Sequence, residues 1–293
     1  MAFRMTAASF SFRTSPEIVP ACVLCEACTR PLTVANPDWR FFRCYECGYW
    51  TSRTAQGNFP HVQYNDTPTF DYNPALDWQE IVRQATTIMA KKFALADKIE
   101  GRFLDVGCSE GIYVAAAAQL GWKAVGGDID LAKIRRAKAR GLDVRQMDFS
   151  DAQFRQGFDF ILLRHVIEHV DEFVEFVRAT SCLLRPDGVL CVECPNQAGI
   201  DALLHRRTLQ EGRFLGNLYP PSHIHAFEPR ALYKLGSKLG LHCRLLVTYS
   251  RSDHDWFLPA YYEGWGVKAL AQRLAASCRM GGNLAAFYVP QKV

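Results

Sequence analysis

The chain has 293 residues, of which 49% are hydrophobic, enough for one full α/β domain plus a small module. The formal net charge of +4 is too small to predict nucleic-acid binding. No stretch is long and apolar enough to predict a membrane span, and the 11 cysteines favour a reducing compartment, so we expect a cytoplasmic protein.

Residues 1–20 are expected to form a flexible tail. They contain Arg4 and Arg13 and no acidic residue before Glu17, a composition faintly similar to that of an organelle transit peptide. Two arginines are few for such a peptide, so a disordered tail is the favoured interpretation.

Residues 21–58 contain two Cys-x-x-Cys pairs. Cys25 and Cys28 form the first pair, and Cys44 and Cys47, followed by Gly48, form the second. Four thiolates at this spacing predict a tetrahedral zinc ribbon, and a site closed by four cysteines has no open position for a substrate. We therefore expect Zn²⁺ in a structural role.

Two alternatives stay open for this module. Cys22 lies three residues before Cys25, so Cys22 and Cys25 could form the first pair instead; the continuation Thr29–Leu32, typical of a ribbon's turn into its hairpin, favours Cys25 and Cys28. Iron in a rubredoxin-like site is the second choice of metal.

The segment after the ribbon, residues 59–98, is expected to be a linker with one amphipathic helix, Trp78–Ala96. A buried strand follows at Arg102–Val106. A tight glycine loop then leads to a helix at Ile112–Leu120, which Gly121 ends.

The loop after this strand carries the strongest functional signal. Gly107 and Gly111 let the backbone turn sharply and approach a ligand, and Asp105 places a carboxylate at the carboxyl end of the strand. A dinucleotide site would need Gly-x-Gly-x-x-Gly, and an acid before the first glycine repels a pyrophosphate but suits a cationic ligand. The next strand, Lys123–Gly127, leads to a second carboxylate, Asp128.

Helices and strands continue to alternate towards the C-terminus. Asp130 is expected to cap the next helix. The remaining predicted elements are a helix at Leu131–Arg140, a strand segment at Asp143–Phe149, a strand at Phe158–His165, a helix at Asp171–Leu184, a turn at Arg185–Gly188, a strand at Val189–Glu193, a helix at Arg230–Leu239, and strands at His242–Tyr249 and Asn283–Val289.

The strand that ends at His165 leads into His165-x-x-Glu168-His169, which has the letters of a zinc-hydrolase motif. In those hydrolases the motif lies within a long regular helix and a third ligand follows downstream, whereas here it begins where a buried strand ends. We therefore reject a zinc hydrolase and expect His165 and Glu168 to line a ligand site.

These segments, in this order, resemble the class I S-adenosylmethionine (SAM) methyltransferases of types 11, 12 and 23. The run Asp105-x-Gly107-x-Ser109-x-Gly111 is similar to their motif I, Asp-x-Gly-x-Gly-x-Gly, with Ser109 in place of the middle glycine. The resemblance covers about residues 102–196 and 223–246. It implies that residues 99–293 form an α/β, Rossmann-like methyltransferase domain with a seven-stranded sheet whose last strand is antiparallel.

The resemblance also implies roles for individual residues. Asp128 would bind the ribose hydroxyls of SAM, Asp148 would accept a hydrogen bond from the adenine amine, and Phe149 would flank the adenine ring. The full set of expected cofactor-binding residues is Asp105, Gly107, Gly111, Asp128, Ile129, Asp148, Phe149 and Arg164.

Two insertions, residues 197–227 and 250–282, lie where the family places substrate contacts. The first insertion contains His223 and His225 in a His-x-His-x-Phe segment that lies by the active site in relatives. Because histidine titrates nearest neutral pH, the candidates for a catalytic base are, in this order, His225, His223 and His165.

Three functions stay open at this point. We favour a SAM-dependent methyltransferase acting on an O, C or N nucleophile of a small molecule, such as a sugar or natural-product intermediate, because the insertions are rich in aromatic residues and histidines. An RNA methyltransferase that binds rRNA or tRNA through its ribbon is the alternative. It would need more basic residues around the site than the modest cluster of Arg206, Arg207 and Arg213. A non-catalytic scaffold would not need Asp105 or Asp128.

Overall fold

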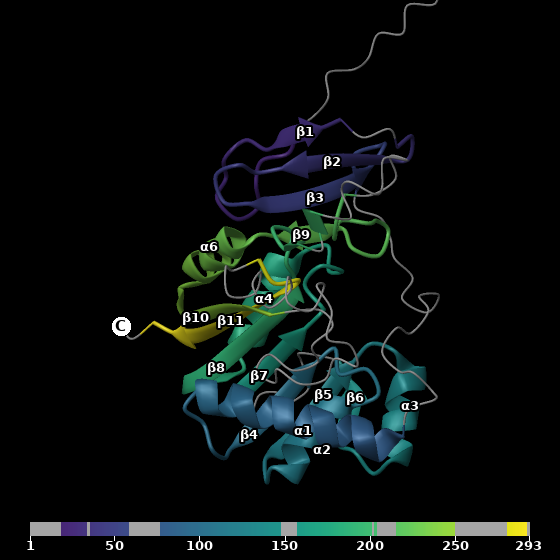
Figure 1. Cartoon of the computed structure of the whole chain (residues 1–293), viewed down its shortest axis with the longest axis vertical. Coiled ribbons are helices and arrows are strands. Elements are labelled where there is room, and N and C mark those ends of the chain that lie inside the picture. Colours follow the sequence, from purple (N-terminus) through teal and green to yellow (C-terminus); the bar gives the residue numbers. More distant parts are fainter. Residues whose placement is uncertain are drawn as a thin grey trace, which may run out of the picture.

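Seven strands form one mixed sheet, and the other elements pack around it (Figure 1). The computed structural model describes residues 19–33, 36–58, 77–147, 157–200, 202–203, 215–249 and 280–291. In chain order, the strands of the large sheet are β4 (Arg102–Val106), β5 (Lys123–Asp128), β6 (Val144–Gln146), β7 (Phe158–Arg164), β8 (Leu184–Pro195), β10 (Leu241–Tyr249) and β11 (Asn283–Pro290).

The order of strands across this sheet is β10-β11-β8-β7-β4-β5-β6. The pairs β4–β5, β4–β7, β5–β6 and β7–β8 are parallel, whereas β11 runs antiparallel to both β8 and β10. The expected Rossmann-like α/β fold and the antiparallel last strand are therefore confirmed.

Strand β4 lies where the strand order reverses. From β4 the chain proceeds through β5 to β6 at one edge, and it then returns to β7 on the other side of β4. The connections that leave β4 and β7 diverge as a result. Open α/β sheets bind their ligands outside the carboxyl ends of the strands at such a point, so the fold alone directs attention to this edge.

Side chains alternate between the two faces of the sheet along each strand, so each face has its own buried apolar surface. A layer of helices covers each of these surfaces. In β7, Phe160 and Leu162 pack into one layer, and Ile161 and Leu163 pack into the other. The first layer contains α1 (Trp78–Leu95) and α2 (Ile112–Gln119), the second contains α4 (Phe173–Ser181) and α6 (Pro229–Leu239), and α3 (Leu131–Ala139) packs beside β5 and β6.

The apolar stripe of α1 explains both its formation and its position. Val82, Ala85, Met89 and Phe93 recur at helical spacing, and all four are buried. The ring of Phe93 stacks on that of Trp122, with ring centroids 3.8 Å apart. Burial of one large apolar side chain of this kind contributes about 1.5–3 kcal/mol, so the stripe holds α1 on the sheet.

Helix ends follow local chemistry. The Asp130 side chain accepts hydrogen bonds from the backbone N–H groups of Ala132 and Lys133, which confirms its predicted role as the cap of α3. Gly240 ends α6 in the left-handed conformation that a residue with a side chain adopts only at a cost.

Within the described ranges, no helix combines the length and the hydropathy needed to cross a membrane.

A predicted turn is wrong. Arg185–Gly188 lies within β8, where that strand passes from Leu184 to Val189 while its partner β7 passes only from Phe158 to Phe160. The extra residues form an irregularity in the ladder, which accommodates Pro186 and Gly188 inside a strand. The helix predicted at Asp171–Leu184 is also shorter than expected, since α4 covers only its middle.

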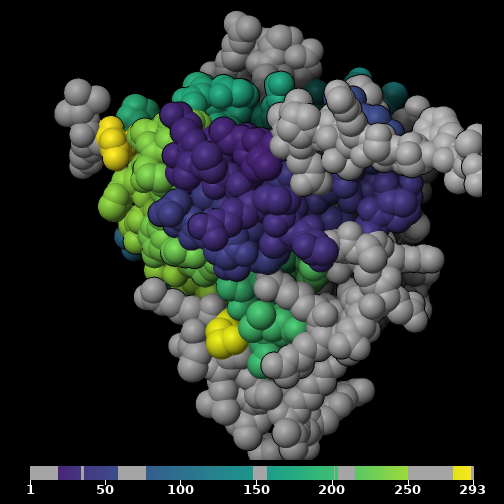
Figure 2. Space-filling model, turned by 90° about the horizontal axis from the view of Figure 1, so that it is seen from above, coloured from purple at the N-terminus to yellow at the C-terminus, as the bar shows by residue number. Residues whose placement is uncertain are grey.

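A second, smaller sheet combines distant parts of the chain. β1 (Arg30–Leu32), β2 (Trp39–Arg43) and β3 (Tyr49–Thr54) come from the N-terminal ribbon, and β9 (His225–Phe227) forms the end of the first insertion. Strands β3 and β9 pair antiparallel and complete a four-stranded sheet in the order β1-β2-β3-β9. The ribbon lies beside α6 and forms the outer surface of that side (Figure 1, Figure 2).

The ribbon shares its core with the large domain. The buried ring of Tyr49 lies 5.6 Å from that of Phe173 in α4 and 5.9 Å from that of Phe227 in β9, measured between ring centroids. Leu24 of the ribbon and Leu232 of α6 belong to the same buried cluster. Because aromatic packing of this kind spans the junction, we describe the ribbon and the domain as one packed unit.

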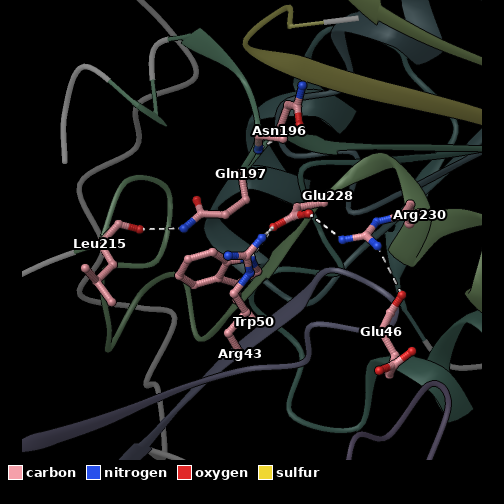
Figure 3. A network of polar contacts seen from close by, with 9 residues as sticks. Arg43, Glu46, Trp50, Asn196, Gln197, Leu215, Glu228 and Arg230 are labelled. Atoms are coloured by element: carbon pink, nitrogen blue, oxygen red, sulfur yellow. Dashed lines mark hydrogen bonds and ion pairs between the residues drawn. The ribbon is translucent and has the colours of Figure 1, made fainter. Parts of the chain in front are cut away.

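Glu228 connects the two parts electrostatically (Figure 3). Its Oε1 accepts hydrogen bonds from Nη2 of Arg43 at 2.6 Å and from Nε1 of Trp50 at 2.9 Å, both from ribbon strands. Arg230 lies 3.4 Å from its other carboxylate oxygen and donates to the backbone carbonyl of Glu46 at 3.3 Å. Hydrogen bonds to an ionised group are the stronger kind, so Glu228 fixes the ribbon against the chain that leaves β9.

Candidate functional site

The loop after β4 depends on its glycines. Gly107 and Gly111 have φ angles of +78° and +82°, in the region that L side chains rarely adopt. A Cβ atom on Gly107 would lie 2.5 Å from Cγ2 of Val166. Ser109, at the position of the middle motif glycine, also has a positive φ, +50°, so the serine adopts a conformation that glycine adopts more easily.

Asp105 places a buried carboxylate beside this loop. It is 3% exposed, and among the described residues no hydrogen-bond partner meets its Oδ2. Burial raises the pKa of Asp105 to about 7, although the nearby Arg164 guanidinium acts to lower it. A buried acceptor without a partner costs about 1–3 kcal/mol, and a bound cationic donor would remove this cost.

Asp128 ends β5 as the second carboxylate of the site. Its Oδ2 accepts from the backbone N–H of Ser109 at 2.7 Å, and its Oδ1 accepts from that of Asp130 at 2.8 Å. The glycine loop and the start of α3 therefore fix the carboxylate. Each carboxylate oxygen can accept a second hydrogen bond, so two further hydroxyl donors can be bound. Ile129, next in the chain, exposes 55% of its surface.

Arg164, at the carboxyl end of β7, is held by a buried acid that the sequence did not single out. Its Nε lies 3.2 Å from Oε2 of Glu193 in β8, and the Tyr249 hydroxyl donates to the same oxygen at 3.2 Å. Glu193 also forms an ion pair with Lys92 of α1, and both side chains are buried. Burial opposes ionisation, yet the Lys92 and Arg164 charges hold the pKa of Glu193 below its usual value.

One sequence signal could have revealed this pair. Lys92 lies on the apolar stripe of α1, between the positions of Met89 and Phe93, where a lysine is out of place unless an acid meets it. Glu193 likewise interrupts an apolar strand. Buried charges of opposite sign in two such elements indicate a pair, and the structure brings them together.

His225, the first candidate for a base, lies deep in the junction with the ribbon. It is 1% exposed, its Nδ1 lies 2.7 Å from the Tyr49 hydroxyl, and its Nε2 lies 3.1 Å from the carbonyl oxygen of Val170. The carbonyl can only accept, so Nε2 carries the proton and Nδ1 accepts from the tyrosine. Burial lowers the pKa of His225 to about 3. This position favours a structural role over contact with a substrate.

The other two histidines differ in exposure. His223 is buried, with Nδ1 3.1 Å from the carbonyl oxygen of Asn217 and Nε2 2.7 Å from the Tyr219 hydroxyl, and burial lowers its pKa to about 3. His165 directly follows β7, and its side chain is 31% exposed. Its Nδ1 lies 3.1 Å from Oε1 of Glu168. Of the three candidates, His165 is the most exposed to solvent.

Four cysteines of the ribbon gather in one cluster, but the set differs from the predicted one. The ligand atoms of Cys22, Cys25, Cys44 and Cys47 lie within 4.8 Å of one another. Sγ atoms are 3.5 Å apart in the pairs Cys22–Cys47 and Cys25–Cys44, close to the separation of about 3.8 Å that tetrahedral Zn–S bonds require. Cys28 is exposed and lies outside the cluster, so its prediction as a ligand is corrected in favour of Cys22.

Backbone geometry explains the correction. In the second knuckle, Gly48 has φ +74° and its N–H donates to the carbonyl of Cys44. The first knuckle repeats this arrangement with Glu26, whose φ is +64° and whose N–H donates to the carbonyl of Cys22. A glutamate rarely adopts this conformation, so residue 26 lacks the glycine that follows the second knuckle, and the spacing of Cys22 and Cys25 was the remaining sign of the first knuckle.

Some predicted residues lie outside the described residues. Asp148 and Phe149, the expected adenine contacts, are among them, as are residues 204–214 of the first insertion and residues 250–279 of the second. At the inner end of the first insertion, the amide of Gln197 donates to the carbonyl of Leu215 at 2.8 Å (Figure 3).

Comparison with known proteins identifies the family. Residues 79–246, more than half of the chain, match the family described as methyltransferase domain. The chain belongs to this family. Together with the strand order and the carboxylates at the ends of β4 and β5, this match makes the protein a class I SAM-dependent methyltransferase.

Individual relatives agree with this assignment. The ubiquinone biosynthesis O-methyltransferase of Brucella ovis is 32% identical over 174 residues, which cover 54% of this chain and 68% of that protein. A chain of the Haloferax volcanii complex of the Trm112 methyltransferase activator with its methyltransferase partner has a TM-score of 0.52 at 15% identity, over 73% of this chain and 94% of that one. Magnesium protoporphyrin IX methyltransferase of Synechocystis, with bound SAH, has a TM-score of 0.50 at 14% identity, over 75% and 90%. At such identities the two structures show the fold alone.

Replacement of single cysteines distinguishes the two ligand sets. We expect Cys28→Ser to keep the same zinc content as wild type and Cys22→Ser to lose one equivalent, because Cys22 belongs to the cluster and Cys28 is exposed. Elemental analysis of protein purified without chelator measures the ratio. Zinc lost from Cys28→Ser but kept in Cys22→Ser would contradict the cluster, and wild-type protein without metal would refute the zinc ribbon.

Proposed function

We propose that this chain transfers the methyl group of SAM to a hydroxyl oxygen of a small molecule. The observation that supports an oxygen acceptor is the relative named ubiquinone biosynthesis O-methyltransferase, which aligns over 68% of its own length. The aligned length exceeds half of this chain, so it is long enough to include a complete cofactor half of the sheet. We infer that the acceptor lies at the carboxyl edge of β4 and β7.

The described residues fit SAM, which supplies an electrophilic methyl group on a cationic sulfonium when bound. Asp105 offers a buried carboxylate oxygen without a partner among the described residues, which suits a positively charged ligand. Asp128 is held so that it can accept from two hydroxyls, which suits a ribose. Gly107 leaves the close backbone approach that a side chain would block.

A hydroxyl acceptor has to lose its proton as its oxygen attacks the methyl carbon, and His165 is our proposal for the group that receives it. The Glu168 carboxylate lies 3.1 Å from Nδ1 of His165 and accepts a hydrogen bond from the N–H at that atom. Nε2 then carries the lone pair, and the exposed part of the ring can present it to an acceptor. Glu168 acts as the positioning residue of this pair.

The four clustered thiolates are proposed to hold Zn²⁺ in a structural role. A site of four cysteines has no open coordination position. The ribbon it stabilises supplies Tyr49 to His225 and Arg43 to Glu228, so the metal would support the segment that carries His223 and His225.

Transfer of labelled methyl groups tests the acceptor class. Purified protein is incubated with methyl-labelled SAM and a cell extract, with and without ribonuclease. We expect label in small, ribonuclease-resistant products, where it withstands the mild base that hydrolyses a methyl ester and is released by ether cleavage with hot hydriodic acid. Label confined to ribonuclease-sensitive material would favour an RNA acceptor and overturn the proposal.

Weakened SAM binding is expected for Asp128→Asn. Loss of the carboxylate charge removes charge-assisted hydrogen bonds worth about 1.5–3 kcal/mol each, which corresponds to a loss of roughly tenfold or more in affinity. Isothermal titration calorimetry measures the change. Asp143→Asn, an exposed aspartate paired with Arg145, is the matched control and should bind SAM like wild type. Equal affinity in Asp128→Asn would refute the ribose assignment.

The pH dependence of SAM binding should report Asp105. Burial places the pKa of Asp105 at about 7, so the carboxyl is mostly neutral below that pH and ionised above it. A cationic ligand favours the ionised form, hence affinity should rise between about pH 6 and about pH 7.5, below the α-amino pKa of about 7.7–8.0. Arg164 and Lys92 favour the same ionisation, and Asp128 and Glu193 oppose it.

Calorimetry in two buffers of different ionisation enthalpy checks this pH dependence by counting the protons that binding releases. Wild type should release protons at the lower pH, and Asp105→Asn should show a flat profile. A flat profile in wild type would contradict the assignment.

A further inference from the structure

A second group of ligand-type side chains lies apart from the cysteine cluster. The ligand atoms of Glu168, His169 and His223 lie within 4.8 Å of one another. Glu168 and His223 are buried, and His169 is partly buried. One carboxylate with two imidazoles is a donor set that proteins use for Zn²⁺ and Fe²⁺.

The backbone, and not only the side chains, brings these residues together. Glu168 and His169 lie in the turn that follows β7, and His223 comes from the end of the first insertion. The carbonyl of Glu168 accepts from the N–H groups of Ile224 at 3.0 Å and His225 at 3.2 Å. The two segments are thus held in register before any ligand is considered.

Each histidine is oriented by a backbone carbonyl. Nδ1 of His169 lies 2.8 Å from the carbonyl oxygen of Ser222, and Nδ1 of His223 lies 3.1 Å from that of Asn217. A carbonyl can only accept, so Nδ1 carries the proton in both rings and Nε2 carries the lone pair. Histidines that bind metals are fixed in this way by a hydrogen bond from the other ring nitrogen.

The carboxylate of Glu168 supplies an independent indication of a ligand. The residue is 1% exposed, and its Oε2 has no hydrogen-bond partner among the described residues, while Oε1 faces His165. A buried carboxylate oxygen without a donor is costly, and a cation beside it would compensate the charge.

We propose that Glu168, His169 and His223 bind one divalent first-row transition-metal ion, such as Zn²⁺, in a site separate from the four thiolates of the ribbon. Three protein ligands leave coordination positions open for water or another oxygen ligand. The Tyr219 hydroxyl lies 2.7 Å from Nε2 of His223 and donates a hydrogen bond to the lone pair that would bind the metal. This hydroxyl has to turn away when the metal ion binds. This site goes beyond methyl transfer and does not depend on it.

The arrangement differs from that of the zinc hydrolases whose motif letters it shares. His165 has a φ of +53°, and Glu168 and His169 lie in a turn before α4 begins at Phe173, so no helix presents the motif. Here the glutamate is a ligand, and the third ligand comes from the insertion.

Titration with Co²⁺ tests the proposal on the full chain with its ribbon zinc retained. We expect a second metal equivalent to bind and to give visible d–d bands without the near-ultraviolet charge-transfer band that thiolate ligands produce. Elemental analysis before and after the titration confirms that the ribbon keeps its zinc. Wild-type protein that binds no Co²⁺, or binds it only by exchange into the thiolate site, overturns the proposal.

Three variants sharpen the test. Glu168→Gln should lose at least tenfold in Co²⁺ affinity, whereas His242→Asn, an exposed histidine of β10, should bind like wild type. Tyr219→Phe removes the competing hydroxyl and should bind several-fold more tightly, an effect that a purely structural hydrogen bond would not produce. Unchanged affinity in a folded Glu168→Gln variant, checked by circular dichroism, overturns the assignment.

Discussion

The parallel pairing of β4 with β5 on one side and with β7 on the other is the constraint on which the site depends. Parallel strands end at the same edge of a sheet, so Asp105, Asp128 and Arg164 meet there although long helical connections separate them in the chain. The reversal of strand order at β4 makes the helical connections diverge at this edge, where the carboxylates can face a ligand and not a neighbouring helix. The glycines at 107 and 111 then let the backbone follow that course.

Two buried acids near this edge differ in how their charge is compensated: Glu193 lies in ion pairs, and Asp105 lies in none within the described part of the chain. Glu193 is buried but is met by Lys92, Arg164 and Tyr249, so its ionisation is compensated within the fold. Asp105 has no comparable partner at its Oδ2 among the described residues. A buried acid in this state binds a cation better than a fully paired one would, because the ligand supplies the missing partner. Glu193 is thus compensated within the fold, whereas Asp105 is the acid that we propose to meet a cationic ligand.

The ribbon and the first insertion position each other. Strand β9 completes the ribbon sheet, Tyr49 donates to His225, and Glu228 gathers Arg43 and Trp50, so the segment around His223 is fixed from the ribbon side. The carbonyl of Glu168 fixes the same segment from the side of the large sheet. The small module therefore helps to position the segment that carries His223 and His225, and the two metal sites that we propose lie on neighbouring segments of one packed unit.

The sequence by itself determined the features that depend on nearby residues. Apolar periodicity predicted the succession of strands and helices along the chain. The glycines at 107 and 111 predicted the tight loop, and the position of Asp130 predicted the cap of α3. Tertiary structure decided what depends on distant partners. Cys22 replaced Cys28 because Glu26 adopts a conformation that the sequence does not signal, and Lys92 met Glu193 across two elements. His225 became a junction residue because a ribbon tyrosine reached its ring. Periodicity and turn chemistry act over a few residues, whereas burial and ion pairing depend on which surfaces the whole sheet brings into contact.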